Sequence, residues 1–257
     1  MEKNSLGPRI LVLDIETLPN QAFVWGTYDQ NVIRFIKQSC IATFSAKWLG
    51  DKKMISRALI DYSGYVPGSY DDQHLVRDLW ELVDQADIII AHNGNGFDFK
   101  VCNARFIFHD LKPPSPFKTI DTKKIFKEIA RFNTNKLDDL CQLLGIGAKI
   151  KTDFDLWEGC INGDKKSWKL MVQYNERDVK MLEELYLKAL PWVKDHPNLT
   201  LWTQGLCPKC GSHQVQYRGY QVTTTRLYRR FQCVNCGGWG RVVKCEKDVK
   251  ALTTNAV

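Results

Sequence analysis

The chain has 257 residues, 44% hydrophobic and 25% charged, which is long enough for one sizeable core and a small additional module. No apolar run approaches the roughly 20 residues of a transmembrane helix, and the first residues lack the apolar segment of a signal peptide, so we expect no membrane partner and a cytoplasmic location, or the host-cell cytoplasm if the source is viral. Residues 191–257 hold ten of the 36 Lys and Arg residues but three of the 29 Asp and Glu residues, and thus carry the whole net charge of +7.

The first predicted element is a buried strand that begins at residues 10–13 and continues through Asp14, Ile15 and Glu16. Side chains two residues apart in a strand point to the same face, so Asp14 and Glu16 would project side by side. Two such carboxylates disfavour each other's ionisation unless a cation lies between them. The pair indicates a divalent metal site at a strand end; a strand that enters a solvated loop is the alternative.

The next predicted elements are strands over residues 40–49 and 54–62, joined by a tight turn. Asp71 or Asp72 would cap a following helix, whose leucines recur at helical spacing. Residues 88–91 form a short apolar strand that we expect beside the first strand in the sheet centre. A strand meander followed by alternating helices and strands predicts a mixed sheet with helices on its faces.

The strand at residues 88–91 runs directly into a polar segment that holds Gly94 and Gly96, where the backbone can approach a ligand closely. Asp98 would lie at the start of a helix that continues to about residue 110. A third carboxylate thus appears at the carboxyl end of a central strand, where open α/β sheets bind their ligands. Further predicted elements are a strand at residues 119–121 and a short helix at residues 137–144, ended by Gly145.

A long helix predicted over residues 167–190 carries an apolar face that includes Tyr174 and Asp178, one turn apart. A charge on a buried stripe is costly unless it is paired or binds a metal. Asp178 is therefore a fourth candidate metal ligand. An acid at the edge of the apolar face is the alternative, and it weakens when three other acids also need a partner.

Taken together, the motifs Asp14-x-Glu16, Asn93 to Asp98, and Tyr174-x-x-x-Asp178 resemble the three exonuclease motifs of the DEDD superfamily, tyrosine branch, in the same order. This branch includes ribonuclease D and the proofreading domains of DNA polymerases. The sequence around Asp14 looks closest to that of family B DNA polymerases. The resemblance implies an α/β, ribonuclease H-like mixed sheet flanked by helices. It covers roughly residues 9–190, and we expect an exonuclease domain over residues 1–192.

The resemblance also implies the metal ligands. Hydrolysis of a phosphodiester uses two Mg²⁺ or Mn²⁺ ions, which prefer carboxylate and water ligands. By this resemblance Asp14 bridges both ions, Glu16 and Asp178 complete the first site, and Asp98 holds the second through water.

Three further residues acquire roles from the same resemblance. Tyr174 would orient the attacking water, since the ordinary pKa of tyrosine is too high for easy proton abstraction at neutral pH. Asn93 and Phe97 would position the terminal nucleotide. For these two positions alternatives remain, because Asn95 competes with Asn93 and Phe97 could equally anchor the core.

Two Cys-x-x-Cys pairs near the end of the chain resemble the knuckles of a zinc ribbon, which we expect over residues 203–250 as a small β domain that binds nucleic acid. In a chain without a secretion signal, this spacing favours metal over disulfides. Four thiolates give a closed, structural Zn²⁺ site, with an iron–sulfur cluster or a redox pair as the alternatives. The predicted zinc ligands are Cys207, Cys210, Cys233 and Cys236, whereas Cys40, Cys102, Cys141 and Cys160 look like core residues.

The hairpin between the two cysteine pairs carries Arg218, Arg226, Arg229 and Arg230, interleaved with aromatic residues. Guanidinium groups bind phosphates and aromatic rings stack on bases, which suits single-stranded nucleic acid. The concentration of net charge in this part of the chain favours the same function. Alternatively, the aromatic residues make the ribbon's core and the arginines coat its surface, or the ribbon binds a protein partner.

The sequence therefore predicts a metal-dependent 3′-to-5′ exonuclease that releases nucleoside 5′-monophosphates, with a structural Zn²⁺ ribbon. Single-stranded DNA is favoured over RNA because the first motif is polymerase-like, although the motifs do not read the 2′-hydroxyl. An exoribonuclease is the alternative enzyme. A nucleic-acid-binding adaptor with an inert nuclease body is the alternative from another class.

Overall fold

The computed structural model describes residues 7–203 and 205–248. They form two compact units, each described by itself: residues 9–186, which we call the body, and residues 7–8 together with the described residues from 187 onwards. Within the described residues, no helix is both long enough and apolar enough to cross a lipid bilayer.

The body is built on a five-stranded mixed sheet in the order β5-β4-β1-β6-β7. The central strand β1 (Ile10–Thr17) pairs antiparallel with β4 (Ile41–Trp48) and parallel with β6 (Ile88–Ala91). The edges are β5 (Ile55–Ala58), antiparallel to β4, and β7 (Lys118–Asp121), parallel to β6. The strands predicted at residues 40–49, 88–91 and 119–121 are thus confirmed, and so is the predicted fold class.

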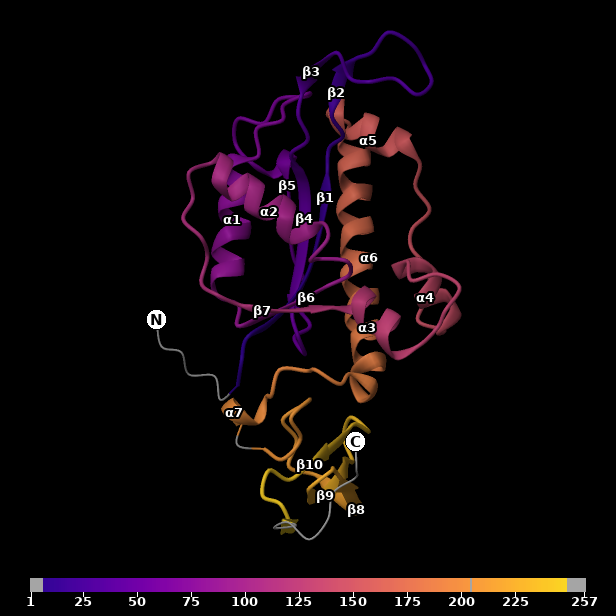
Figure 1. Ribbon diagram of the computed structural model, residues 1–257. Coiled ribbons are helices and arrows are strands. Elements are labelled where there is room, and N and C mark those ends of the chain that lie inside the picture. Colours follow the sequence, from indigo (N-terminus) through magenta and orange to yellow (C-terminus); the bar gives the residue numbers. More distant parts are fainter. Residues whose placement is uncertain (1–6, 204, 249–257) are drawn as a thin grey trace. The chain divides into compact units, whose positions relative to one another are not determined.

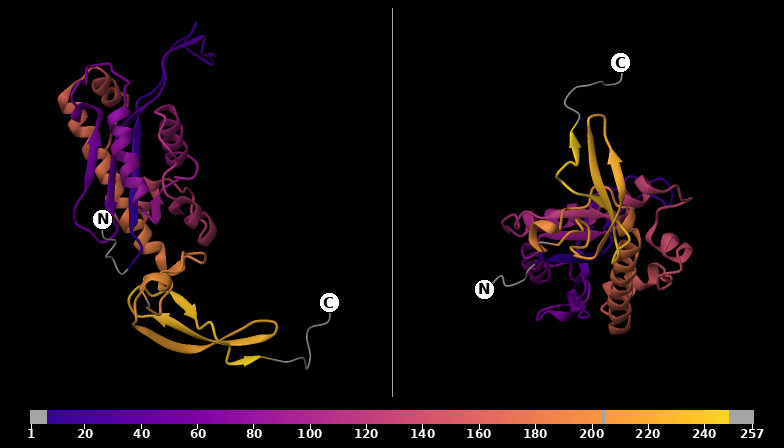
Figure 2. Two further views of the ribbon diagram at one scale, coloured as in Figure 1. Left: turned by 90° about the vertical axis from the view of Figure 1, so that its left-hand side faces the viewer. Right: turned by 90° about the horizontal axis from the view of Figure 1, so that it is seen from below.

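Helices cover both faces of this sheet (Figure 1 and Figure 2). Helices α1 (Gln73–Asp84) and α2 (Asp98–Phe108) lie on one face, and the long α6 (Lys165–Ala189) runs along the other. The remaining helices of the body are α3 (Thr122–Ile129), α4 (Leu137–Leu143), α5 (Phe154–Ile161) and the 3-10 helix η1 (Leu59–Asp61).

The alternation of β1 divides its side chains between the two faces of the sheet. Leu11, Leu13 and Ile15 are at most 3% exposed and belong to the core that β1 shares with α1 and α2. Because Asp14 and Glu16 alternate with these residues, their side chains point to the face along which α6 runs. The same pattern that builds the core therefore presents the two acids to α6.

Two local predictions near α1 are confirmed only in part. The strand predicted over residues 54–62 ends at Ala58, because the Asp61 carboxylate accepts the N–H of Ala58 (2.8 Å) and turns the chain into η1. The Asp71 carboxylate accepts the N–H of Gln73 (3.1 Å), the first residue of α1, whereas Asp72 makes no capping hydrogen bond. The buried Asp72 carboxylate instead pairs with Arg105 and His109, which ties the start of α1 to α2.

Several elements of the body have no counterpart among the predicted ones. The segment after β1 forms a hairpin of β2 (Gln21–Phe23) and β3 (Arg34–Lys37), whose strands pair antiparallel. Helices α3 and α5 are also new. The predicted helices over residues 98–110, 137–144 and 167–190 are confirmed as α2, α4 and α6, with shifts of one or two residues at their ends.

The second unit contains η2 (Leu190–Trp192), α7 (Thr200–Thr203) and a small antiparallel sheet, which we call the ribbon (residues 205–248). Strand β9 (Arg226–Cys233) is central in the ribbon. It pairs with β8 (Val215–Val222), β10 (Trp239–Arg241) and β11 (Lys247–Asp248). The antiparallel strands predicted between the cysteine pairs are confirmed as β8 and β9.

Candidate active site

Three carboxylates from β1 and α6 meet on one face of the sheet. Asp14, Glu16 and Asp178 each offer an oxygen atom, and these atoms all lie within 4.8 Å of one another. Asp14 and Glu16 are half-buried, whereas Asp178 is 1% exposed. The β1 period of two and the helical period of α6 are both needed to bring these residues together.

Asp98 lies beside this group as the first residue of α2. Its side chain is buried, and its carboxylate accepts the backbone N–H of Ile15 (3.3 Å), the residue between Asp14 and Glu16. Burial raises the pKa of Asp14, and repulsion from the Asp98 carboxylate raises it further. The structure therefore brings all four predicted acids to one place, with Asp98 outside the tight group of three.

Asn175 and Tyr174, on α6, fix the polar surroundings of the acids. The buried Asn175 amide donates to Asp14 Oδ2 (2.6 Å). Tyr174 is half-buried, and its ring packs edge-on against Trp157 of α5, with 6.3 Å between ring centroids. Tyr174 is thus close to Asp178, as predicted, whereas Asn175 was not anticipated because one amide on a helix carries no distinguishing pattern.

Lys149 is the most important residue that the sequence did not predict. Its ammonium group forms an ion pair with Asp178 Oδ2 and donates to the Tyr174 hydroxyl (3.1 Å). Burial alone would lower the pKa of Lys149, but Asp178 and Tyr174 together raise it above its ordinary value. Lys149 therefore remains charged and holds the Asp178 carboxylate and the Tyr174 hydroxyl in fixed positions.

Replacing Lys149 with Ala is expected to lower the free energy of unfolding of the metal-free body by about 3 kcal/mol at high pH, because Asp178 loses its charged partner. The loss should be smaller at low pH, where Asp178, whose pKa burial raises, accepts a proton instead. Denaturant unfolding of the variant measures both values. Lys151→Ala, at an exposed position two residues away, is the matched control, and equal losses in the two variants would contradict the account.

The four carboxyl groups have pKa values above their ordinary range, and burial is the main cause for each. The pKa of Glu16 is raised to about 7, with further repulsion from Asp178 and Asp98 and an opposing effect of Lys149. The pKa of Asp98 is raised to about 6 although the N–H of Ile15 stabilises its charged form. Crowded acids that resist ionisation are typical of a site that binds a cation.

The donor set fits hard divalent cations. Asp178 Oδ1 is buried and has no hydrogen-bond partner among the described residues, so this oxygen is free to bind a ligand. Asp14 and Glu16 present further carboxylate oxygens within 4.8 Å of it. Oxygen donors of this kind suit Mg²⁺ or Mn²⁺ and not the softer metals that favour nitrogen or sulfur. A divalent ion here would also relieve the mutual repulsion of the acids.

This electrostatic situation predicts how stability depends on pH and metal. A carboxyl whose pKa is higher in the folded chain than in the unfolded chain stabilises the fold at low pH, and this contribution is lost as the pH rises through the folded value. For Glu16 and Asp98 the loss falls between their ordinary range and about pH 7. We therefore expect Mn²⁺ to raise the melting temperature of the body more at about pH 8 than at about pH 5.

Differential scanning calorimetry with and without Mn²⁺ measures this difference, and Glu16→Gln is the variant that should diminish it. A Mn²⁺ effect of equal size at both pH values would show that these carboxyl groups do not compete for protons and metal.

The loop before Asp98 is shaped by Asp121, another residue that the sequence did not single out. Asp121 accepts the backbone N–H groups of Asn93 (3.0 Å) and Asn95 (3.4 Å), and Asn93 has a left-handed backbone (φ +67°). Phe97 is 43% exposed, so the alternative that it anchors the core is wrong. Asn93 and Phe97 thus lie on the loop that leads to Asp98, and their contact with a nucleotide stays a prediction.

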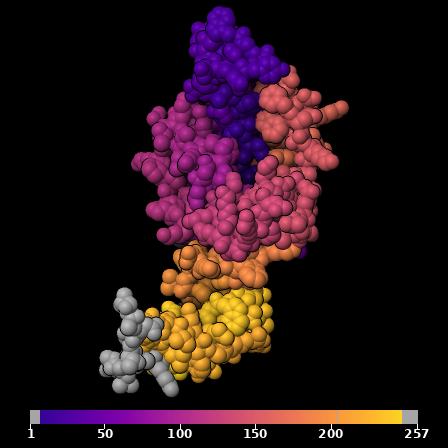
Figure 3. Space-filling model, turned by 45° about the vertical axis from the view of Figure 1, so that its right-hand side comes forward, coloured from indigo at the N-terminus to yellow at the C-terminus, as the bar shows by residue number. Residues whose placement is uncertain are grey.

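A cavity of about 390 Å³ opens next to Glu16, lined also by Thr17, Pro19, Phe154 and Trp157. The Trp157 indole donates to the carbonyl of Thr17 (3.1 Å), which ties α5 to the end of β1. In the space-filling view, indigo atoms near the start of the chain lie in a hollow between magenta and orange segments (Figure 3). Phe154 and Trp157 were not predicted as site residues because α5, which carries them, was not predicted.

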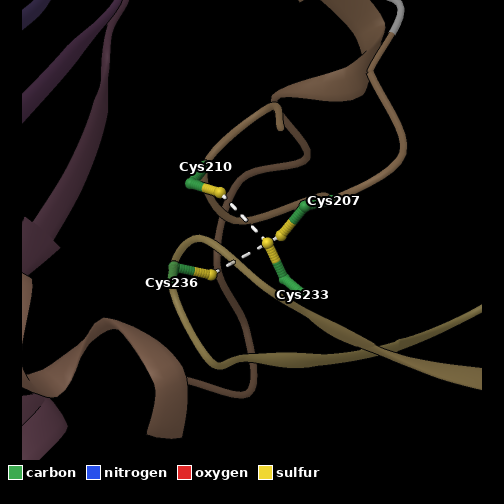
Figure 4. Close-up of side chains that lie close together, drawn as sticks. All are labelled: Cys207, Cys210, Cys233 and Cys236. Carbon is green, nitrogen blue, oxygen red and sulfur yellow. Dashed lines mark hydrogen bonds between the residues drawn. The ribbon is translucent and has the colours of Figure 1, made fainter. Parts of the chain in front are cut away.

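The four predicted zinc cysteines converge in the ribbon (Figure 4). The sulfur atoms of Cys207 and Cys236 are 3.7 Å apart, and those of Cys210 and Cys233 are 3.6 Å apart. Tetrahedral zinc with Zn–S bonds of 2.3 Å separates its sulfur ligands by about 3.8 Å. The cluster therefore has the dimensions of a four-thiolate zinc site.

The backbone favours a thiolate at Cys233, whereas burial raises the pKa of Cys207 and of Cys236. Burial raises the pKa of Cys233, but the N–H groups of Cys236 and Asn235 oppose this and lower it to about 7. Gly211 and Gly237 follow the two pairs with left-handed backbones (φ +71° and +74°), which let the chain fold around the sulfur atoms. The four cysteines that we predicted to be core residues are buried, as expected: Cys40, Cys102, Cys141 and Cys160.

The four predicted arginines of the ribbon are exposed, but the structure does not gather them on one surface. Arg218 lies on β8, and Arg226, Arg229 and Arg230 lie on β9. Because side chains alternate along a strand, Arg229 points to the opposite face from Arg226 and Arg230.

Comparison with known proteins agrees with the fold of the body. Among solved structures, the chain is similar to the family B DNA polymerase from the hyperthermophilic archaeon Pyrobaculum calidifontis, with a TM-score of 0.54 and 18% sequence identity. The similarity covers 72% of this chain and 25% of the polymerase chain, and at this identity it shows a shared fold. No curated protein matches the sequence. The sequence profile of the RNase H superfamily matches residues 11–190, and the chain therefore belongs to the RNase H superfamily.

Proposed function

We propose that the protein is a metal-dependent 3′-to-5′ exonuclease of the tyrosine branch of the DEDD superfamily, acting on single-stranded DNA. The observation that carries this proposal is the convergence of Asp14, Glu16, Asp98 and Asp178 beside the Tyr174 hydroxyl. Membership of the RNase H superfamily supports a nuclease, and the likeness to a family B DNA polymerase supports the choice of DNA.

In this proposal Asp14, Glu16 and Asp178 hold one Mg²⁺ or Mn²⁺ ion, and Asp98 contributes to a second. When bound, such ions activate a water molecule and neutralise charge that develops on the attacked phosphate. The Tyr174 hydroxyl, which burial and Asp178 keep protonated by raising its pKa, orients the attacking water.

The chain's own contacts keep this arrangement in place. The Asn175 amide fixes Asp14, and Lys149 fixes Asp178 and Tyr174. Such fixed geometry contributes to catalysis because the reacting groups need little reorganisation. The cavity beside Glu16 supplies the aromatic rings of Phe154 and Trp157, against which a terminal nucleotide can pack. The ribbon holds one structural Zn²⁺ and binds the strand.

The test is hydrolysis of 5′-labelled single-stranded oligonucleotides, DNA and RNA of the same sequence, with Mg²⁺ and resolved on a gel. Stepwise shortening of DNA is expected, and an inverted 3′-terminal nucleotide should block it. Shortening of RNA alone would replace the proposal with an exoribonuclease. A retarded but uncut strand would replace it with a non-catalytic adaptor, and early internal cuts would exclude an exonuclease.

A further inference from the structure

The strand register of the ribbon sorts its cationic and aromatic side chains between two faces. Directly opposite residues of neighbouring strands point to the same face of a sheet. Trp239 of β10 lies opposite Gln232, and Arg241 lies opposite Arg230. Trp239, Arg241 and Arg230 therefore share one face, which we call the arginine–tryptophan face. Arg229 projects from the other face.

The Arg230 guanidinium is held in place at the centre of this face. Its Nε atom donates to the carbonyl of Arg218 (2.6 Å), at the irregularity in the pairing of β8 with β9. Gly219 lies beside the Arg230 guanidinium, and its left-handed backbone (φ +67°) suits a glycine at this irregularity. The guanidinium carbon lies 5.2 Å from the centroid of the Trp239 ring. Because this guanidinium is already held in place, it loses little further conformational freedom when a ligand binds.

A cavity of about 410 Å³ lies between these side chains, lined by Gln221, Arg230, Trp239, Gly240 and Arg241. Its lining has two guanidinium groups, one indole that is 46% exposed and one amide, and no carboxylate. A volume of this size falls in the range of small-ligand sites, about 300–1,000 Å³. The combination of positive charge and a stacking ring complements a polyanion whose bases are free to stack.

The opposite face serves the ribbon's own core. Phe231 is 4% exposed, and a Cβ on Gly240 would come within 2.4 Å of its ring, so the backbone of β10 packs closely on it. Arg229 lies over the ring of Tyr217 (4.2 Å), in the same way as Arg241 lies over Tyr228 (4.1 Å). Arg229 and Arg241 are thus a matched pair, stacked alike on a tyrosine but on opposite faces.

We propose that the arginine–tryptophan face binds one nucleotide of a single-stranded nucleic acid. Arg230 and Arg241 contact its phosphate, Trp239 stacks on its base, and the Gln221 amide reaches the base edge. The class of ligand rests on the proposed function, whereas the choice of face rests on the register of β9 and β10. Arg229 takes no part in this contact.

The experiment measures the affinity of the zinc-loaded, full-length protein for a fluorescent single-stranded oligonucleotide by anisotropy, on an Asp14→Asn background that keeps the strand intact. Arg241→Ala is expected to weaken binding about tenfold, the effect of one lost charged contact, and to lower the salt slope by about 0.7. Trp239→Ala should weaken binding roughly fivefold to a hundredfold, with recovery in Trp239→Phe. Arg229→Ala, the matched control, should change it less than twofold.

Zinc content and thermal unfolding of each variant show that the ribbon is folded. Equal losses of affinity in Arg229→Ala and Arg241→Ala would overturn the choice of face. Unchanged affinity in all variants would overturn the proposal and would indicate that the face binds a protein partner instead. These outcomes are independent of catalysis, because binding is measured without turnover. Failure of the wild-type protein to shorten an oligonucleotide would instead contradict the proposed nuclease.

Discussion

Replacing Asp14 with Asn is expected to lower Mg²⁺-dependent hydrolysis about a thousandfold or more. Asp14 lies within 4.8 Å of the Glu16 and Asp178 oxygens, with which it would hold the first proposed ion. Loss of a few kcal/mol of charge stabilisation corresponds to such a factor at about 1.4 kcal/mol per tenfold. Initial rates on a labelled oligonucleotide measure it.

The fold should survive this substitution. The Asn side chain keeps an oxygen that can accept the Asn175 amide, which now donates to Asp14 Oδ2. Because one charge is removed from a group of repelling acids, the metal-free variant should melt at the same temperature as the parent or higher. Glu184→Gln, which removes a charge from an exposed position of α6, is the control. Equal activity of Asp14→Asn and Glu184→Gln would end the assignment of the acids.

The second large effect is expected from loss of zinc. Structural zinc supplies about 10–16 kcal/mol of binding free energy in small domains at neutral pH, and most side chains of β8 are exposed, so the ribbon's own core is small. Cys233→Ser should therefore abolish both zinc binding and the fold of the ribbon. The measurements are the zinc content per chain and hydrogen exchange, which should show loss of amide protection in β8, β9 and β10.

Cys245→Ser provides the matched control, because Cys245 lies outside the four-cysteine group. It should retain one zinc ion per chain and full protection of the ribbon. In Cys233→Ser the amides of β1, β4 and β6 should stay protected, since the body has its own core. Full zinc occupancy in Cys233→Ser, or equal loss in both variants, would show that the thiolates do not hold a structural ion.

Regular periodicity is what made much of this arrangement predictable. Alternation in β1 indicated that Asp14 and Glu16 share a face, and helical spacing on α6 placed Asp178 one turn after Tyr174. Both patterns are local, so the sequence alone contains them. The position of Asp98 after a central strand followed from the general location of ligand sites in α/β sheets. The Cys-x-x-Cys spacing likewise located the ribbon's metal cluster.

What could not be predicted depends on loops and register. Lys149 reaches Asp178 across 29 positions of sequence because the chain turns after α4, where Gly145 and Gly147 have left-handed backbones. No local pattern marks such a contact. Once the bounds of β9 are known, strand alternation puts Arg229 and Arg230 on opposite faces of the sheet. The side chains that lie beside Arg230 depend on the register of β10, which the sequence does not reveal.

Asp72 shows how tertiary contacts override a local preference. An acid before a helix is a good candidate for an N-cap. Here Arg105 and His109 of the α2 region offer a charged partner at a fully buried position, and the Asp72 carboxylate also accepts the N–H of Ile41 (2.9 Å). A buried carboxylate needs paired charges more than a cap, so the side chain is used to join β4, α1 and α2.

The most direct test of the proposed active site is crystallographic. Crystals of the protein soaked with Mn²⁺ and measured at the manganese absorption edge locate each bound ion by its anomalous signal. We expect anomalous peaks within bonding distance of the Asp14, Glu16 and Asp178 oxygens, with a second ion toward Asp98. An acidic centre without manganese, in crystals that bind the ion at other places, would contradict this expectation.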